Sequence, residues 1–242
     1  MLGSLIGSKS WQWMARGKHP GLKDYFSLGA SSPLLTAICD WIEKGYRGLT
    51  ERVDPAGRRM AWRFWVGGHK PGVIVGGIVR DSSDSVGRPY PLMILGMGNL
   101  QGWEKSWQAL PLSFEKTWMQ MEAIATRLTR DLRELQGDVS HLASPQVQPP
   151  SQVSMAGAHR NDGSPDSLAG GPGDTEDTVF VPITGLTPGE EALDIRALML
   201  QVSATYSGIP KAVFLGGHPA CPMAAIFRRP LQPHDFTRLW TS

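Results

Sequence analysis

The sequence predicts an α/β protein: a three-layer α/β/α sandwich around a mixed central sheet, formed by a single domain with a long disordered excursion. Three observations support this prediction. Short apolar runs typical of buried strands recur along the chain, segments with helical spacing lie before, between and after them, and 242 residues suffice for one large core.

Composition excludes several classes of protein. The hydrophobic share of 41%, the charged share of 19% and a net charge of +2 describe a globular protein with no charge-based reason to bind nucleic acid. Two cysteines fit a reducing compartment, and neither a basic leader nor an apolar run of spanning length is present. We therefore expect a cytoplasmic protein without membrane insertion.

The first elements are a helix and three strands. The segment 31–46 predicts a helix that Ser32 caps and that Pro33 begins, with Leu34, Ile38, Trp41, Ile42 and Gly45 on one face. Before it, Trp11 and Trp13 alternate with polar residues, as on a half-exposed strand. Three apolar strands are expected afterwards, at 59–68, 71–80 and 91–98.

Helical spacing returns at Trp103 and continues to Leu135, and Pro111 is expected to divide this stretch into a short helix and a long one. A segment rich in Pro, Gly and Ser follows at 137–178 and is interpreted as a flexible linker. Residues 1–136 and 179–242 are then two parts of the same domain.

The part after the linker contains two helices and two strands. The segment 187–208 predicts a helix with Thr187 and Glu190 at capping-box spacing. Strands are expected at 211–217 and 223–229, and a closing helix at 231–240.

The loop DSSDSVGRPYPL, residues 81–92, is unusually polar for a connection between two buried strands. Turn-forming Asp and Ser side chains explain much of it, and Gly87 and Pro89 fix the backbone on either side of Arg88. The Arg88 guanidinium could pair with Asp84 within the loop, or bind an anion or an acidic group of a partner. Internal pairing is the favoured alternative.

Residues 82–92 resemble the S-x-D-x-V-G-R-x-[YF]-P-L signature of the TagF/ImpM family, accessory proteins of bacterial type VI secretion. The segment GKHPGLKDYF, residues 17–26, is similar to the G-K-x-P-x-x-G-D-F pattern of the same family. Lys23 stands where that pattern has Gly, and Tyr25 precedes Phe26. The end of the chain is similar to the end of family members, though less specifically.

The resemblance implies a three-layer α/β fold and a non-enzymatic, post-translational negative regulator of secretion that binds a forkhead-associated scaffold protein. It implies neither a cofactor nor a metal. The residues it singles out as family-motif or partner-binding candidates are Lys18, His19, Asp24, Asp84, Arg88 and Tyr90. If the two motif loops meet, Asp24 and Asp84 should compete for the Arg88 guanidinium.

The main alternative is a small-molecule or phospho-ligand binding protein, or a hydrolase, that uses the Lys18/His19/Asp24 and Asp84/Arg88 loops. Other chemistry has weaker support. His218 and Cys221 lack a second ligand pair, Cys39 lies beside an apolar helix face, and the glycines of 67–77 match neither nucleotide-binding pattern.

Overall fold

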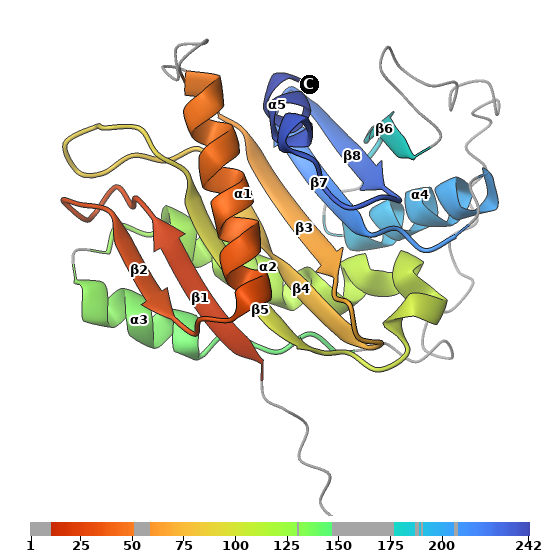
Figure 1. Ribbon diagram of the computed structural model, residues 1–242, viewed down its shortest axis with the longest axis horizontal. Coiled ribbons are helices and arrows are strands. Elements are labelled where there is room, and N and C mark those ends of the chain that lie inside the picture. Colours follow the sequence, from red (N-terminus) through yellow and green to blue (C-terminus); the bar gives the residue numbers. More distant parts are fainter. Residues whose placement is uncertain are drawn as a thin grey trace, which may run out of the picture.

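The computed structural model describes residues 11–50, 59–129, 131–146, 177–186, 189, 191–205 and 208–242. Their centre is one eight-stranded sheet in the order β2-β1-β5-β4-β3-β7-β8-β6 (Figure 1). The strands are β1 (Gln12–Gly17), β2 (Phe26–Gly29), β3 (Ala61–Gly67), β4 (Val73–Arg80), β5 (Leu92–Asn99), β6 (Thr178–Pro182), β7 (Ala212–His218) and β8 (Cys221–Phe227).

All strand pairs of this sheet are antiparallel, so the prediction of a mixed sheet is wrong. Strands β3, β4 and β5 follow one another through loops that contain no helix, and such loops join only antiparallel neighbours. The alternation of helical and apolar segments suggested crossover connections, but the central strands do not use them. The α/β class itself is confirmed.

Helices cover both faces of the sheet (Figure 1). One face carries α1 (Pro33–Thr50) and α5 (Pro233–Thr241). The other carries a 3₁₀ helix, η1 (Trp103–Ala109), with α2 (Leu110–Thr126), α3 (Leu132–Ser140) and α4 (Glu191–Thr205). Within the described residues, no helix is both long enough and apolar enough to cross a bilayer.

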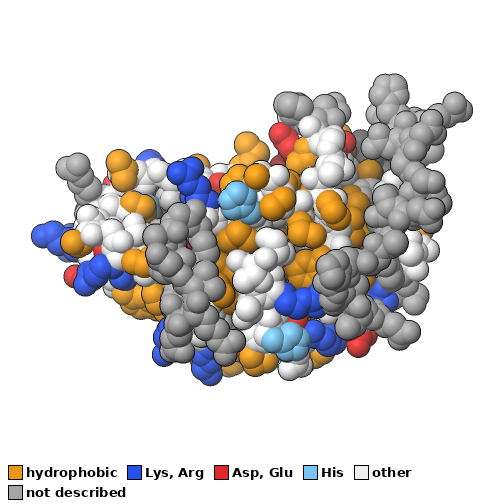
Figure 2. All heavy atoms as spheres, turned by 90° about the horizontal axis from the view of Figure 1, so that it is seen from above, with side chains coloured by type: hydrophobic (Ala, Val, Ile, Leu, Met, Phe, Trp, Pro, Cys, Tyr) orange, Lys and Arg blue, Asp and Glu red, His pale blue; other side chains and the backbone are white. Residues whose placement is uncertain are grey.

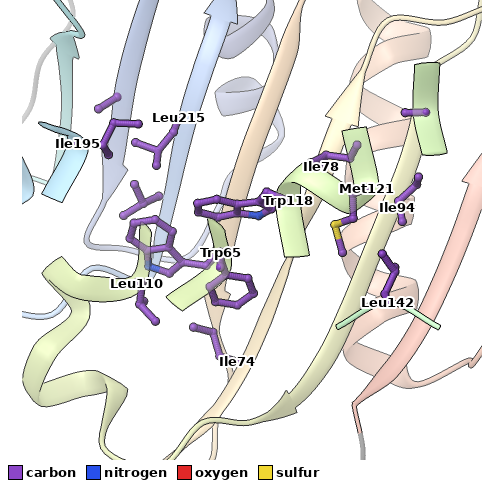
Figure 3. Packing of buried hydrophobic residues seen from close by; sticks show 14 of the residues in the cluster. Trp65, Ile74, Ile78, Ile94, Leu110, Trp118, Met121, Leu142, Ile195 and Leu215 are labelled. Atoms are coloured by element: carbon purple, nitrogen blue, oxygen red, sulfur yellow. The ribbon is translucent and has the colours of Figure 1, made fainter. Parts of the chain in front are cut away.

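The core beneath α2 is built on stacked aromatic rings. Trp65 of β3 and Trp118 of α2 lie at its centre (Figure 3), with ring centroids 6.2 Å apart. Phe114 stacks on Trp118 at 5.2 Å. All three side chains are buried. Aromatic rings bury large areas, so this stack fixes α2 across the strands beneath it.

Helix α1 begins as the sequence predicts. Pro33 is its first residue, and the backbone N–H of Leu35 donates to Ser32 Oγ at 3.3 Å. The buried face is centred one residue further along than expected: Leu35 and Cys39 are fully buried, whereas Leu34 is only partly buried.

The helical stretch after Trp103 is divided twice rather than once. Pro111 lies in the first turn of α2, as expected, but α2 ends at Thr126 because Arg127 is extended. Helix α3 starts afresh at Leu132, and its N-cap Asp131 accepts a hydrogen bond from the Arg133 N–H at 2.8 Å. Leu128, counted in the helical pattern, is exposed.

The segment expected to be a linker begins inside α3, which continues to Ser140, and Leu142 is buried in the core. Strand β6 starts at Thr178, the last residue of that segment. Residues 147–176 lie outside the described residues, as do Thr187 and Glu190 of the expected capping box. Strands on both sides of the segment share one sheet, because β7 pairs with β3.

Helices α1 and α5 meet at Gly45, which leads to a first prediction. A Cβ at this position would lie 2.2 Å from Cγ of Phe236 in α5. We expect Gly45→Ala to lower the free energy of unfolding by about 1–3 kcal/mol, because the Phe236 ring is attached too close to its backbone to move aside. Gly48→Ala is the matched control in the same helix, since a Cβ there meets nothing within 4 Å.

Urea denaturation of both variants measures the difference. Gly48→Ala should be more stable than the parent protein by about 0.5–1 kcal/mol, the usual gain of alanine over glycine in a helix. Equal stabilities of the two variants would show that α5 does not press against α1 at Gly45.

Candidate functional site

The two motif segments lie side by side at one end of the sheet. Residues 18–25 connect β1 to β2, and residues 81–91 connect β4 to β5. Strands β1 and β5 are antiparallel neighbours in which Gly17 pairs with Leu92, so both loops leave the sheet at the same point (Figure 1). The Ser85 N–H donates to the Leu22 carbonyl at 2.8 Å and joins the loops directly.

Asp84 is the centre of this arrangement, and its side chain is fully buried. Its Oδ1 accepts hydrogen bonds from the backbone N–H groups of Val86, at 3.0 Å, and Arg88, at 2.9 Å. Its Oδ2 receives Arg88 Nε at 2.6 Å and Lys18 Nζ at 3.1 Å. One carboxylate therefore closes the loop on itself and binds the neighbouring loop.

These contacts alter the acidity of Asp84. Burial by itself would raise the pKa of the carboxyl, but the hydrogen bonds from the Arg88 backbone, Lys18 and the Arg88 guanidinium outweigh it. The pKa of Asp84 is held well below its ordinary value. The carboxylate is therefore ionised throughout the neutral range and fully engaged by its donors.

Arg88 connects the two motifs. Its Nε binds Asp84, while its Nη2 donates to Asp24 Oδ1 at 3.0 Å and to the Lys23 carbonyl at 2.8 Å. The two expected partners thus share the guanidinium instead of competing for it, because each uses a different nitrogen. A lysine ammonium, with its donors on one atom, could not bridge them in this way.

The outer side of this network is accessible to solvent. The side chains of Arg88 and Asp24 are 57% and 82% exposed, whereas that of Lys18 is only 15% exposed. Lys18 Nζ is also held by the Arg88 carbonyl at 3.3 Å. Arg88 and Asp24 therefore face outward and Lys18 supports them from within.

Two glycines let the first motif segment approach its neighbours closely: Gly17 faces the second loop, and Gly21 faces the chain after α2. At Gly17, which has φ of +123°, a Cβ would lie 2.0 Å from the Pro91 carbonyl oxygen. At Gly21 it would lie 1.9 Å from the Thr129 carbonyl oxygen. The turn before Asp24 needs no glycine at position 23, since Lys23, like the other described non-glycine residues, has negative φ.

Tyr90 belongs to an adjoining cluster of polar and aromatic side chains. Its ring packs edge-on against Tyr25 at 5.5 Å. The Tyr25 hydroxyl donates to Glu43 Oε1 at 2.8 Å and accepts a hydrogen bond from Arg16 Nε. Burial is the main reason that the pKa of Tyr25 rises to about 12. This cluster joins the first motif to α1, which carries Glu43.

His19 is directed into the protein. It is fully buried, the Gly21 N–H donates to its Nδ1 at 3.1 Å, and its Nε2 lies 3.3 Å from the Ile124 carbonyl oxygen. These partners assign the neutral tautomer with the proton on Nε2. Burial lowers the pKa of His19. The structure therefore places His19 between the loop and α2, away from the outward-facing residues.

Sequence reasoning missed three residues that hold the site in place. Asp81 accepts hydrogen bonds from the Met60 N–H at 2.9 Å and from Trp240 Nε1 at 3.0 Å, and so ties the loop to the residue before β3 and to α5. Arg16 and Glu43 form an ion pair at 2.8 Å. The partners of all three are distant in sequence, and only the polar character of the loop indicated Asp81.

Two other kinds of chemistry were considered from the sequence, a reactive cysteine and a metal site. Cys39 is buried, and burial raises the pKa of its thiol to about 12, so the thiol stays protonated at neutral pH. In the part of the chain that the structure describes, no three His, Cys, Asp or Glu side chains come close enough together to hold a metal ion.

Comparisons with known proteins agree with these motifs. Residues 15–142, slightly more than half of the chain, match the model of the TagF N-terminal domain, described as type VI secretion system-associated. No curated protein sequence matches the chain significantly. Among solved structures, PA0076 from Pseudomonas aeruginosa PAO1 is similar, with a TM-score of 0.55 and 17% identity over 96% of this chain and 95% of that one. At this identity the likeness concerns the fold.

The buried carboxylate predicts a specific acid response. Because the pKa of Asp84 is lower in the folded than in the unfolded protein, its contribution is present above about pH 4, the ordinary aspartate pKa, and is lost as the pH falls towards the folded value. Asp84→Asn should lower the melting temperature at pH 7 and weaken its dependence on pH below 4. Asp24→Asn, at an exposed position, is the control and should change both much less. Melting curves between pH 2.5 and 7 test this, and parallel curves for Asp84→Asn and the parent would contradict it.

His19 predicts a second pH effect, in a higher range. Its folded pKa is lowered, so the unfolded protein takes up a proton first and stability falls as the pH drops below about 6.5. His19→Gln, which keeps a donor for the Ile124 carbonyl, should be less stable by about 1–2 kcal/mol at pH 7.5 but should lose less stability between pH 7.5 and 5.5. His69→Gln, at an exposed position, is the control. An unchanged pH slope in His19→Gln, measured by urea denaturation, would refute the assignment.

Proposed function

The chain belongs to the TagF family of type VI secretion-associated proteins, and on that basis we propose that it is a cytoplasmic, non-enzymatic regulator of this secretion system. In this proposal the protein restrains secretion after translation by binding the system's forkhead-associated scaffold protein. The partner and the direction of regulation are those that the resemblance of the two motifs implies. The contact surface is proposed from the geometry of the motif loops.

The observation that carries the proposal is the outward side of the joined loops, which we call the motif surface: Asp24, Tyr25, Val86 and Arg88. These side chains are 82%, 40%, 72% and 57% exposed, the values for Asp24 and Arg88 referring to the side chain alone. They combine two opposite charges, a phenol ring and an aliphatic group, a mixture that suits a protein interface. Asp84 holds Val86 and Arg88 in place, and Arg88 in turn binds Asp24, which reduces the entropy lost when a partner binds.

The same geometry favours binding over catalysis. Lys18, Asp84 and the inner side of Arg88 satisfy one another, so these groups are not poised to transfer a proton or attack a substrate. Nor does the paired arrangement favour the alternative of a phospho-ligand site in these loops, since the Arg88 donors closest to Asp84 are already engaged.

The proposal predicts that Val86 contributes to binding. Val86→Lys should weaken binding of the purified scaffold at least tenfold, which is about 1.4 kcal/mol, because an apolar contact is replaced by a solvated charge. Val86 is 72% exposed and contacts Asp84 only through its backbone N–H, so the melting temperature should change little. Leu200→Lys in α4 is the matched control, a change of the same kind at an exposed leucine on another element, and should bind normally.

Biolayer interferometry with the scaffold from the same organism gives the affinities, and secretion assays in that organism give the biological effect. Secretion should rise in cells that carry Val86→Lys. If the parent protein does not bind the scaffold and its deletion leaves secretion unchanged, the proposed function is wrong. If the parent binds and Val86→Lys binds equally well, the motif surface is not the contact.

A further inference from the structure

A pocket separate from the motif surface opens where β3 begins and β4 ends. Its volume is about 570 Å³. Three arginines line it, Arg59, Arg63 and Arg80, together with apolar side chains that include Ile78, Leu215 and Pro219. This end of the sheet is the upper one in Figure 1, and seen from above it shows hydrophobic side chains in the middle, with Lys and Arg around them and few acids (Figure 2).

The hollow forms because α2 ends before it covers the last row of the sheet. Glu122 of α2 still lies over Arg63 of β3, but the helix stops at Thr126. The next row towards the end of the sheet contains Arg80, Ala61 and Gly217, which are register partners on β4, β3 and β7. Ala61, the small register partner of Arg80, also lines the pocket and leaves space beside the Arg80 side chain.

Two of the three guanidinium groups have no ion-pair partner among the residues that the structure describes. Arg63 forms a two-pronged ion pair with Glu122, at 2.7 and 2.8 Å. For Arg59 and Arg80, by contrast, no hydrogen bond or ion pair to a described residue exists, although Arg80 is partly buried. Besides Glu122, the described lining contains one carboxylate, Asp81. Its oxygens accept hydrogen bonds from the Met60 N–H and from Trp240 Nε1.

A partly buried guanidinium without a counter-charge loses hydration that nothing in the described structure replaces. Arginine donors match carboxylate and phosphate oxygens, and small-molecule sites of 300–1,000 Å³ typically have apolar walls with a few polar groups, as this pocket does. We propose that the pocket binds a small organic oxyanion, a carboxylate or a phosphate ester with an apolar body. Arg80 and Arg59 hold the anionic group, and Ile78, Leu215 and Pro219 contact the body. This site goes beyond the proposed scaffold binding and does not depend on it.

Phenyl phosphate and benzoate are suitable probes, since each joins an anion to an apolar ring, and benzyl alcohol is the neutral comparison. Titration followed by amide NMR should give saturable shifts at 59–63 and 78–81, with dissociation constants of about 1 mM for fragments of this size. The tighter of the two anions identifies whether a phosphate or a carboxylate is preferred. Benzyl alcohol should bind at least tenfold more weakly.

Arg80→Gln should weaken binding of the better anion at least tenfold and leave the rest of the NMR spectrum unchanged, because Arg80 holds no described neighbour in place. Arg59→Gln should weaken it as well. Arg133→Gln, an exposed arginine on α3, is the matched control and should bind like the parent. The proposal is overturned if neither anion gives saturable shifts, if benzyl alcohol binds equally well, or if Arg80→Gln has no effect.

Discussion

The buried carboxylate of Asp84 is the interaction on which the motif end of this protein depends. A charge without solvent contact is stable only when donors surround it, and here two backbone N–H groups, a lysine and an arginine do so. The donors come from both loops, so satisfying the charge also aligns the loops. The exposed residues Val86 and Arg88 are therefore positioned by a carboxylate that is itself buried.

Two aspartates of the same loop, close together in sequence, have different tasks. Asp84 organises the loop and its neighbour, whereas Asp81 connects the base of the loop to Met60, just before β3, and to Trp240 of α5. The hydrogen bond between Asp81 and Trp240 therefore links the motif loops directly to α5. Trp240 is itself a buried residue of the core beneath α5, so this hydrogen bond ties the loop to that core.

The sequence could predict the features that depend on near neighbours. Helix α1 with its Ser32 cap, the central strands and the pairing of Asp84 with Arg88 are encoded within short segments. The antiparallel arrangement and the break after Thr126 could not be read in this way. Leu128 continues a helical pattern by coincidence, since it is exposed, and the chain bends there so that Thr129 can lie against Gly21. Likewise His19, a candidate for partner contact, is buried because of α2, which the motif itself does not contain.

The pairing of β3 with β7 has a consequence for how the chain folds. Ala61 lies opposite Gly217, so the middle of the sheet joins segments that are far apart in the sequence. Such pairing slows the search for the native state, although doubling the length of the intervening loop adds only about 0.6 kcal/mol to its closure. During synthesis, β3 emerges from the ribosome long before β7 and presents an unpaired edge until the last strands arrive. The sheet is therefore incomplete until β7 has been synthesised, and the exposed edge of β3 is the part that a chaperone would need to protect until then.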